Sequence, residues 1–305
     1  MRLLVVSPDY ASHALPMIEV ARAWAVHHGE VVVATGRATR PLVEAAGLTW
    51  TELRLGAGSN SGVIEVAEQP SGEDDHLRAF FDATRAGPVA TLVYQADGRR
   101  RDLLHEPDRV MDRLADILRE HRPDRIVVDH VAFGARLALH ALGEDPATMV
   151  LGHPSALSAP GEVYGAPPAW PTSMRPSDAD LARIEEHCRA SLVDLAAGAR
   201  ELLARRAPNR PPFDDPTASA GRPTIYVYPA ALHDASRALP PQHAFIGALS
   251  RAEGLDDVVL PGGSGPRVTV ALGSFLSARD DVLATAVRAA HLGGWRLALA
   301  YGSSD

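Results

Sequence analysis

Two side chains suited to moving a proton each follow a run of apolar residues. His13 comes shortly after residues 3–6, and Asp129 ends a second apolar run at residues 125–129. An imidazole titrates close to neutral pH, so a histidine in a loop beside a strand end is a candidate general base. The alternatives are that His13 is a solvated loop residue at a helix start and that Asp129 only caps the following helix.

The elements around His13 come in the order strand, loop, helix, strand. We expect a helix that opens at Pro16, because apolar residues recur at helical spacing over 17–25, and a second strand at 31–34. This order is typical of a doubly wound α/β domain, in which ligands lie outside the carboxyl ends of the strands. His13 and Asp129 both fall at such ends.

The loop that carries His13 favours an uncharged ligand. Residues 8–12 contain no glycine, so backbone amides cannot approach a phosphate as they do in a glycine-rich loop. Asp9 would also repel an anion. We therefore expect a neutral acceptor, and not a nucleotide, at this loop.

Helical and strand patterns alternate through the first 249 residues. A stretch rich in Gly, Ser, Asp and Glu at 56–75 indicates a loop, and Ser177-Asp178 is a cap for a long helix over 179–206. The other expected elements are helices at 41–46, 102–121 and 132–142, and strands at 48–53, 148–152, 224–228 and 243–247.

Residues 153–177 contain six prolines, a density that no regular element survives. Loops of this length inside a compact domain tend to be lids or binding segments, although a passive connector is the alternative. We expect Tyr164 and Trp170 to form aromatic walls of an acceptor site, together with the loops around His13 and residues 56–100.

A second domain begins after a linker. Residues 250–266 are charged and then rich in Pro, Gly and Ser, which predicts a connection between a domain at 1–249 and a segment at 267–305. That segment has one strand–helix–strand pattern, with a turn at Gly273-Ser274. One such unit has no stable fold alone, so we expect a second domain that is started and not finished in this sequence.

Composition excludes several classes of partner. The net charge is −8 and all 30 basic residues are arginine, which argues against nucleic acid, an anionic membrane and Schiff-base chemistry. The single cysteine, Cys188, excludes a disulfide and a cysteine metal site. No metal motif is expected from acidic residues, because the pairs Asp74-Asp75, Asp214-Asp215 and Asp256-Asp257 lie in loop-like sequence. With neither a signal peptide nor a membrane-length apolar run, we expect a cytoplasmic protein, and a homodimer is compatible with the sequence.

The sequence resembles the family-one nucleotide-sugar-dependent glycosyltransferases, in the bacterial branch that acts on macrolides and other natural products. The resemblance covers all 305 residues but only about the first three-quarters of a family member. Its carriers, in order, are His13-Ala-Leu-Pro16, Val31-Val-Val-Ala-Thr-Gly36, Glu44-Ala-Ala-Gly-Leu48, Ile126-Val-Val-Asp129, Phe245-Ile-Gly-Ala-Leu249 and Val268-Thr-Val-Ala-Leu-Gly-Ser274. Residues 7–12 lack the glycines and the first histidine common in bacterial members.

The resemblance implies the GT-B fold, with two Rossmann-like doubly wound domains, the second incomplete here. It implies inverting transfer of a sugar from a UDP- or dTDP-sugar to a hydroxyl of a lipophilic small molecule, without metal or cofactor. His13 would be the general base and Asp129 its orienting partner. Gly273 and Ser274 would meet the donor diphosphate, unless they form an ordinary tight turn.

The family motifs that grip the nucleotide sugar would lie beyond residue 305, so we expect this segment alone to be inactive. Two other functions stay open. One is a non-catalytic acceptor-binding or partner protein without a donor domain, and the other is a GT-B-like nucleotide-sugar epimerase. The reading frame past Asp305 would discriminate between the enzyme and the binding protein.

Overall fold

The computed structural model describes residues 1–56, 58, 73–102, 104–213, 215, 217, 223–249, 262–271 and 279–300. These residues fall into two compact units, one within residues 1–249 and one within residues 262–300. Gly273 and Ser274 lie outside the described residues.

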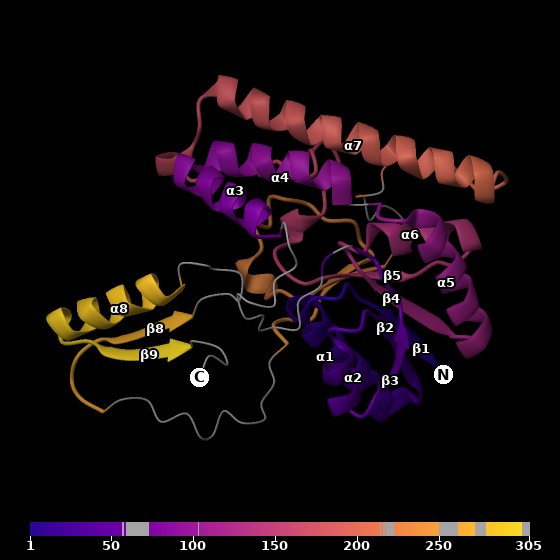
Figure 1. Cartoon of the computed structure of the whole chain (residues 1–305), viewed down its shortest axis with the longest axis horizontal. Helices are drawn as coiled ribbons and strands as arrows, with labels where there is room; N and C mark the ends of the chain where they lie inside the picture. Colours follow the sequence, from indigo (N-terminus) through magenta and orange to yellow (C-terminus); the bar gives the residue numbers. More distant parts are fainter. Residues whose placement is uncertain are drawn as a thin grey trace. The chain divides into compact units, whose positions relative to one another are not determined.

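A parallel sheet forms the centre of the first unit (Figure 1). Its seven strands lie in the order β3-β2-β1-β4-β5-β6-β7, and every neighbouring pair is parallel. The strands are β1 (Leu3–Val6), β2 (Val31–Thr35), β3 (Thr49–Glu52), β4 (Arg125–Asp129), β5 (Ala147–Val150), β6 (Thr224–Tyr226) and β7 (His243–Phe245). The expected doubly wound α/β architecture is therefore confirmed for this unit.

Side chains of the central strands alternate between two buried layers. Leu3 and Val5 of β1 pack with helices α1 (Ala11–His28) and α2 (Arg40–Ala45). Leu4 and Val6 point the other way, as the period of a strand requires, and pack with the helices of the opposite layer. Those helices are α5 (Pro107–His121), α6 (Phe133–Leu142) and the C-terminal part of α7 (Asp178–Arg206).

Two helices that the sequence pattern did not reveal follow the expected loop, and the first overlaps its end. Residues 73–102 are two helices, α3 (Glu73–Ala86) and α4 (Pro88–Asp102), which break at Gly87 with φ 113°. Figure 1 shows α3, α4 and α7 side by side. The loop expected at 56–75 is therefore wrong for residues 73–75, where α3 begins. The contact of residues 56–100 with an acceptor stays a prediction.

The long helix α7 begins as predicted. Ser177 is its N-cap, and the Ser177 hydroxyl accepts a hydrogen bond from the Asp180 amide at 3.2 Å. Before it, residues 153–177 contain only two short 3₁₀ turns, Pro154–Ala156 and Thr172–Met174. The proline-rich segment is otherwise irregular, as expected.

The second unit contains one strand–helix–strand motif. Strand β8 (Arg267–Ala271) pairs in parallel with β9 (Arg296–Ala300), and α8 (Arg279–Gly293) connects them. This agrees with the predicted strand, helix and strand after the linker.

Candidate active site

His13 lies on a helix and not in the loop where we expected it. Helix α1 begins at Ala11, and the carbonyl of Tyr10 accepts hydrogen bonds from the amides of His13 (2.9 Å) and Ala14 (2.8 Å). Pro16 is therefore inside the helix and not at its start. Pro16 is the sixth residue of α1, where a proline removes only the hydrogen bond that an amide there would donate to the Ser12 carbonyl, so its position was a poor marker of the boundary.

The turn between β1 and α1 is fixed to the neighbouring loop by Asp9. Its carboxylate accepts hydrogen bonds from the amides of Ala38 (3.1 Å) and Thr39 (2.9 Å) and from the Thr39 hydroxyl (2.9 Å). Gly36 permits this approach, because a Cβ there would lie 2.2 Å from the Asp9 carboxylate. The start of α1 is therefore held in place from outside the helix.

His13 and Asp129 form a hydrogen-bonded pair. The His13 Nδ1 atom is 2.8 Å from the Asp129 Oδ2 atom. Asp129 is fully buried, whereas the His13 side chain is 27% exposed. The other carboxylate oxygen, Oδ1, accepts a hydrogen bond from the amide of Val131 at 2.9 Å. The carboxylate is thus held on both sides, while part of the imidazole stays accessible.

The contact shifts the pKa of both side chains. Burial alone would lower the pKa of His13, but the hydrogen bond and the charge of Asp129 outweigh it and raise that pKa above 6.5. Burial alone would raise the pKa of Asp129, but His13 and His130 lower it to about 2. Asp129 is therefore ionised and can only accept, so His13 Nδ1 carries the proton. In the neutral ring the basic lone pair is then on Nε2.

The pair lies at the point in the sheet where the strand order reverses. Strand β1 is followed by α1 and then β2 on one side, and β4 is followed by α6 and then β5 on the other. Strands β1 and β4 are neighbours, in register from Leu3 opposite Arg125. The carboxyl ends of such a pair form the crevice in which open α/β sheets bind their ligands.

His130 is a member of the site that the sequence did not reveal. Its Nδ1 atom lies 3.2 Å from Asp129 Oδ1, and the His130 side chain is only 10% exposed. The ring centroids of His13 and His130 are 6.3 Å apart. The one available signal was that His130 directly follows Asp129 at the end of a buried strand.

Tyr164 lies near this pair. Its ring packs edge-on against Phe133, with centroids 5.7 Å apart, and the Arg99 guanidinium lies 5.2 Å from the Tyr164 centroid. Burial raises the pKa of Tyr164, and the charge of Asp129 adds to that effect. Phe133 opens helix α6 directly after β4, which places Tyr164 beside the segment that carries Asp129.

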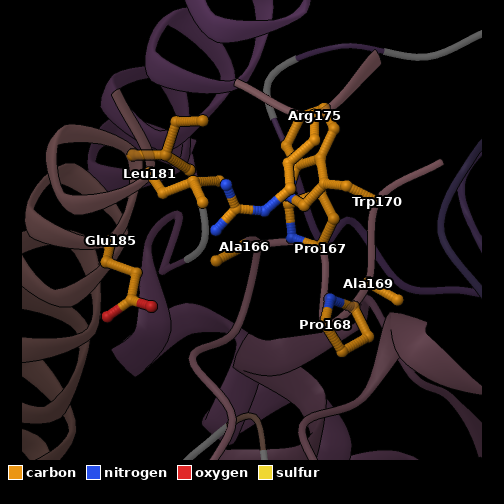
Figure 2. Close-up of a pocket in the computed structure, with 9 residues that line it drawn as sticks. Ala166, Pro167, Pro168, Ala169, Trp170, Arg175, Leu181 and Glu185 are labelled. Carbon is orange, nitrogen blue, oxygen red and sulfur yellow. The ribbon is translucent and has the colours of Figure 1, made fainter. Parts of the chain in front are cut away.

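Trp170 lines a separate pocket, with a cavity volume of about 280 Å³ (Figure 2). The pocket lies between the proline-rich segment and α7, and the residues that line it are Ala166, Pro167, Pro168, Ala169, Trp170, Arg175, Leu181, Ile184 and Glu185. Tyr164 is not among them. Trp170 also packs against a small core between α4 and α7. The two predicted aromatic residues therefore lie in different surroundings.

Among the described residues, no three or more His, Cys, Asp or Glu side chains gather in a way that could hold a metal ion. No helix in the described part of the chain is long and apolar enough to cross a membrane.

Solved structures share this fold, although no family model and no curated protein matches the sequence. The glycosyltransferase of kitacinnamycin is 19% identical, with a TM-score of 0.56, over 100% of this chain and 66% of its own. The calicheamicin glycosyltransferase CalG4 is 15% identical, with a TM-score of 0.54, over 100% and 65%. SsfS6 of Streptomyces sp. SF2575, in complex with thymidine diphosphate, is 15% identical, with a TM-score of 0.55, over 98% and 67%.

This chain spans about two thirds of the length of each of these enzymes. At such low identity the likeness establishes the fold and leaves activity to be argued from the site. The chain has the α/β fold of the bacterial natural-product glycosyltransferases of the GT-B type.

Proposed function

We propose that this chain is the acceptor-binding part of an inverting glycosyltransferase. The enzyme would transfer a sugar from a UDP- or dTDP-sugar to a hydroxyl of a lipophilic small molecule, without a metal ion. The observation that carries the proposal is the 2.8 Å contact between His13 Nδ1 and the buried carboxylate of Asp129.

The His13–Asp129 pair suits deprotonation of a hydroxyl. A sugar or phenol hydroxyl is a weak nucleophile, and a positioned imidazole can remove its proton as it attacks. In the proposed step the acceptor oxygen bonds to the anomeric carbon while its proton passes to His13 Nε2. The bond from that carbon to the nucleoside diphosphate breaks, and the diphosphate leaves with the electron pair. Asp129 stabilises the imidazolium that forms.

Attack from the face opposite the leaving group inverts the anomeric carbon. The base must therefore face the acceptor and not the diphosphate, which agrees with a first loop that lacks phosphate-binding glycines. Asp9 is committed to the neighbouring loop and keeps that region unfavourable for an anion.

For the acceptor, we propose contacts with Tyr164 and Trp170. Tyr164 lies beside the segment that carries Asp129, and Trp170 lines a pocket of mixed polarity whose apolar walls include Pro167, Leu181 and Ile184. Aromatic and proline side chains offer flat surfaces to a lipophilic ligand at low entropic cost. The charged groups at this pocket are paired, since Arg175 donates to Asp178 at 2.8 Å and Glu185 accepts from Arg189 at 3.1 Å.

The donor side of the proposal concerns the second unit, in which Gly273 and Ser274 lie outside the described residues. We propose that Gly273 and Ser274 contact the diphosphate of the donor and that residues 267–305 belong to the nucleotide-sugar domain. The support is the shared fold with SsfS6, whose structure contains thymidine diphosphate. We expect the 305-residue chain to bind an acceptor but to need a complete donor domain for turnover.

A transfer assay tests the proposed function. The 305-residue chain, and any longer product of its reading frame, would be incubated with UDP- and dTDP-sugars and a panel of hydroxylated aromatic and macrocyclic acceptors, with product detected by mass spectrometry. Glycosylated product that depends on His13 supports the enzyme. Acceptor binding without transfer by every product of the frame would favour a binding protein and contradict the enzyme.

A further inference from the structure

His130 lies against the carboxylate of Asp129 on the side away from His13. Each carboxylate oxygen has a histidine beside it: His13 Nδ1 is 2.8 Å from Oδ2, and His130 Nδ1 is 3.2 Å from Oδ1. The two ring planes are inclined by 35°.

The backbone of His130 is fixed on two sides. Its amide donates to the Met149 carbonyl of β5 at 2.9 Å, and its own carbonyl accepts from Arg136 at 3.4 Å. With 10% of its side chain exposed, the imidazole has little room to move away from Asp129.

The charge of Asp129 decides which nitrogen of His130 is protonated. Within the described residues, His130 Nδ1 is buried and has no partner in full hydrogen-bond geometry. A buried nitrogen lone pair facing an anionic oxygen would be repelled, and an N–H there would be attracted. The tautomer with the proton on Nδ1 is therefore the favoured one, and a small rotation of the ring completes a charge-assisted hydrogen bond.

We propose that His130 is a positioning residue for the His13–Asp129 pair. It holds Oδ1 from one side, together with the amide of Val131, so that Oδ2 stays directed at His13 Nδ1. His130 does not touch the acceptor and takes no proton from it. This role rests on the proposed function of the pair, but the geometry that it maintains can be measured without turnover.

The test compares two variants of similar size. His130→Asn places an amide N–H where the imidazole Nδ1–H was, and His130→Leu has no donor. In the 305-residue chain with ¹⁵N-labelled histidine, the His13 ring is assigned by its loss in His13→Ala. We expect its protonated Nδ1 signal to persist in His130→Asn and to shift toward the Nε2–H tautomer in His130→Leu. Both variants are first checked for native circular dichroism.

The kinetic measurement uses the protein, translated from this reading frame, that transfers sugar. We expect His130→Leu to lower kcat by about tenfold, with an unchanged acceptor KM, and His130→Asn to restore most of it, as for loss of one hydrogen bond to a charged group. A His130→Leu protein with wild-type His13 tautomer and kcat would overturn the proposal, as would equal losses in both variants. If the tautomer shifts as expected but no protein from this reading frame transfers sugar, the positioning role stands and the proposed function is contradicted.

Discussion

Two histidine–aspartate pairs with full hydrogen bonds, among the residues that the structure describes, have nearly equal length and very different surroundings. His13 and Asp129 are 2.8 Å apart at the carboxyl edge of the sheet, and His187 and Asp97 are 3.0 Å apart between α7 and α4. Asp129 is fully buried, whereas 48% of Asp97 and 33% of His187 are exposed.

Burial and location give the two pairs different chemistry. An exposed ion pair is screened by water and contributes about 0–1 kcal/mol. A buried carboxylate cannot be solvated, so it depends on its hydrogen-bond donors and acts strongly on them in return. Only the sheet-edge pair also lies at the point where α/β sheets bind ligands. The contact alone does not identify a catalytic pair. The first two experiments below therefore use His187 and Asp97 as controls.

Replacing the base should have the largest effect. In the longer protein that transfers sugar, we expect His13→Ala to lower turnover by ~10²- to 10⁴-fold, the contribution of a positioned general base. The folded state should change little, because His13 lies at the first turn of α1 with part of its ring in solvent. The matched control, His187→Ala, removes the other paired histidine and should leave turnover within about twofold of wild type. Steady-state kinetics and thermal unfolding measure both. Near-normal turnover in His13→Ala would remove the mechanism.

Replacing the carboxylate should have a smaller effect. Asp129→Asn leaves the imidazole in place but favours the wrong tautomer, so we expect turnover to fall by roughly 10- to 10³-fold, less than for His13→Ala. Asp97→Asn is the control for loss of one carboxylate charge and should leave turnover unchanged. If the two substitutions had equal effects, burial would not be what distinguishes the pairs.

The pH dependence of activity should report the same pair. His13 must be neutral to accept a proton, and its pKa is raised above 6.5. We therefore expect kcat/KM to rise with pH, with a midpoint above 6.5. In Asp129→Asn the burial of His13 is no longer outweighed, so that midpoint should move to lower pH. A midpoint that Asp129→Asn leaves unchanged would contradict the assignment.

Protonation of Asp129 in acid should lower the stability of the fold. Its pKa falls from 3.8 to about 2 in the folded chain, so its contribution to the free energy of unfolding is present above pH 3.8 and is lost as pH falls toward 2. Urea unfolding of wild type and Asp129→Asn at neutral pH and near pH 3 measures this. We expect the difference between the two proteins to shrink at the lower pH.

The acceptor pocket should give a smaller and selective effect. We expect Trp170→Ala to raise the acceptor Kd severalfold and to leave nucleotide-sugar binding unchanged, since Trp170 lines a pocket beside α7. It also packs on the small core there, so some stability is lost as well. Trp24→Ala, which removes a tryptophan packed on the α1 layer, is the control for general destabilisation. Equal losses of both ligands in Trp170→Ala would indicate a folding role.

Much of the first unit followed from sequence pattern. Apolar runs such as residues 3–6 and 125–129 mark buried parallel strands, and each lies where expected. Because parallel strands align their carboxyl ends, His13 and Asp129 could be expected to meet before any coordinates were known.

What the sequence did not predict depends on tertiary contacts. Helix α4 packs against α7, which is distant in sequence, and α3 packs against α4. The start of α1 is held by hydrogen bonds that Asp9 accepts from the next loop. The role of His130 depends on the 3.2 Å approach of its ring to Asp129. No local pattern reports that distance.

The most direct test of the account is a crystal structure of the protein with a hydroxylated acceptor bound. We predict His13 Nε2 within about 2.6–3.2 Å of the acceptor hydroxyl, the reach of a general base, with Nδ1 still bonded to Asp129. An acceptor whose reactive hydroxyl meets a different side chain, with His13 Nε2 turned against protein, would contradict the central claim.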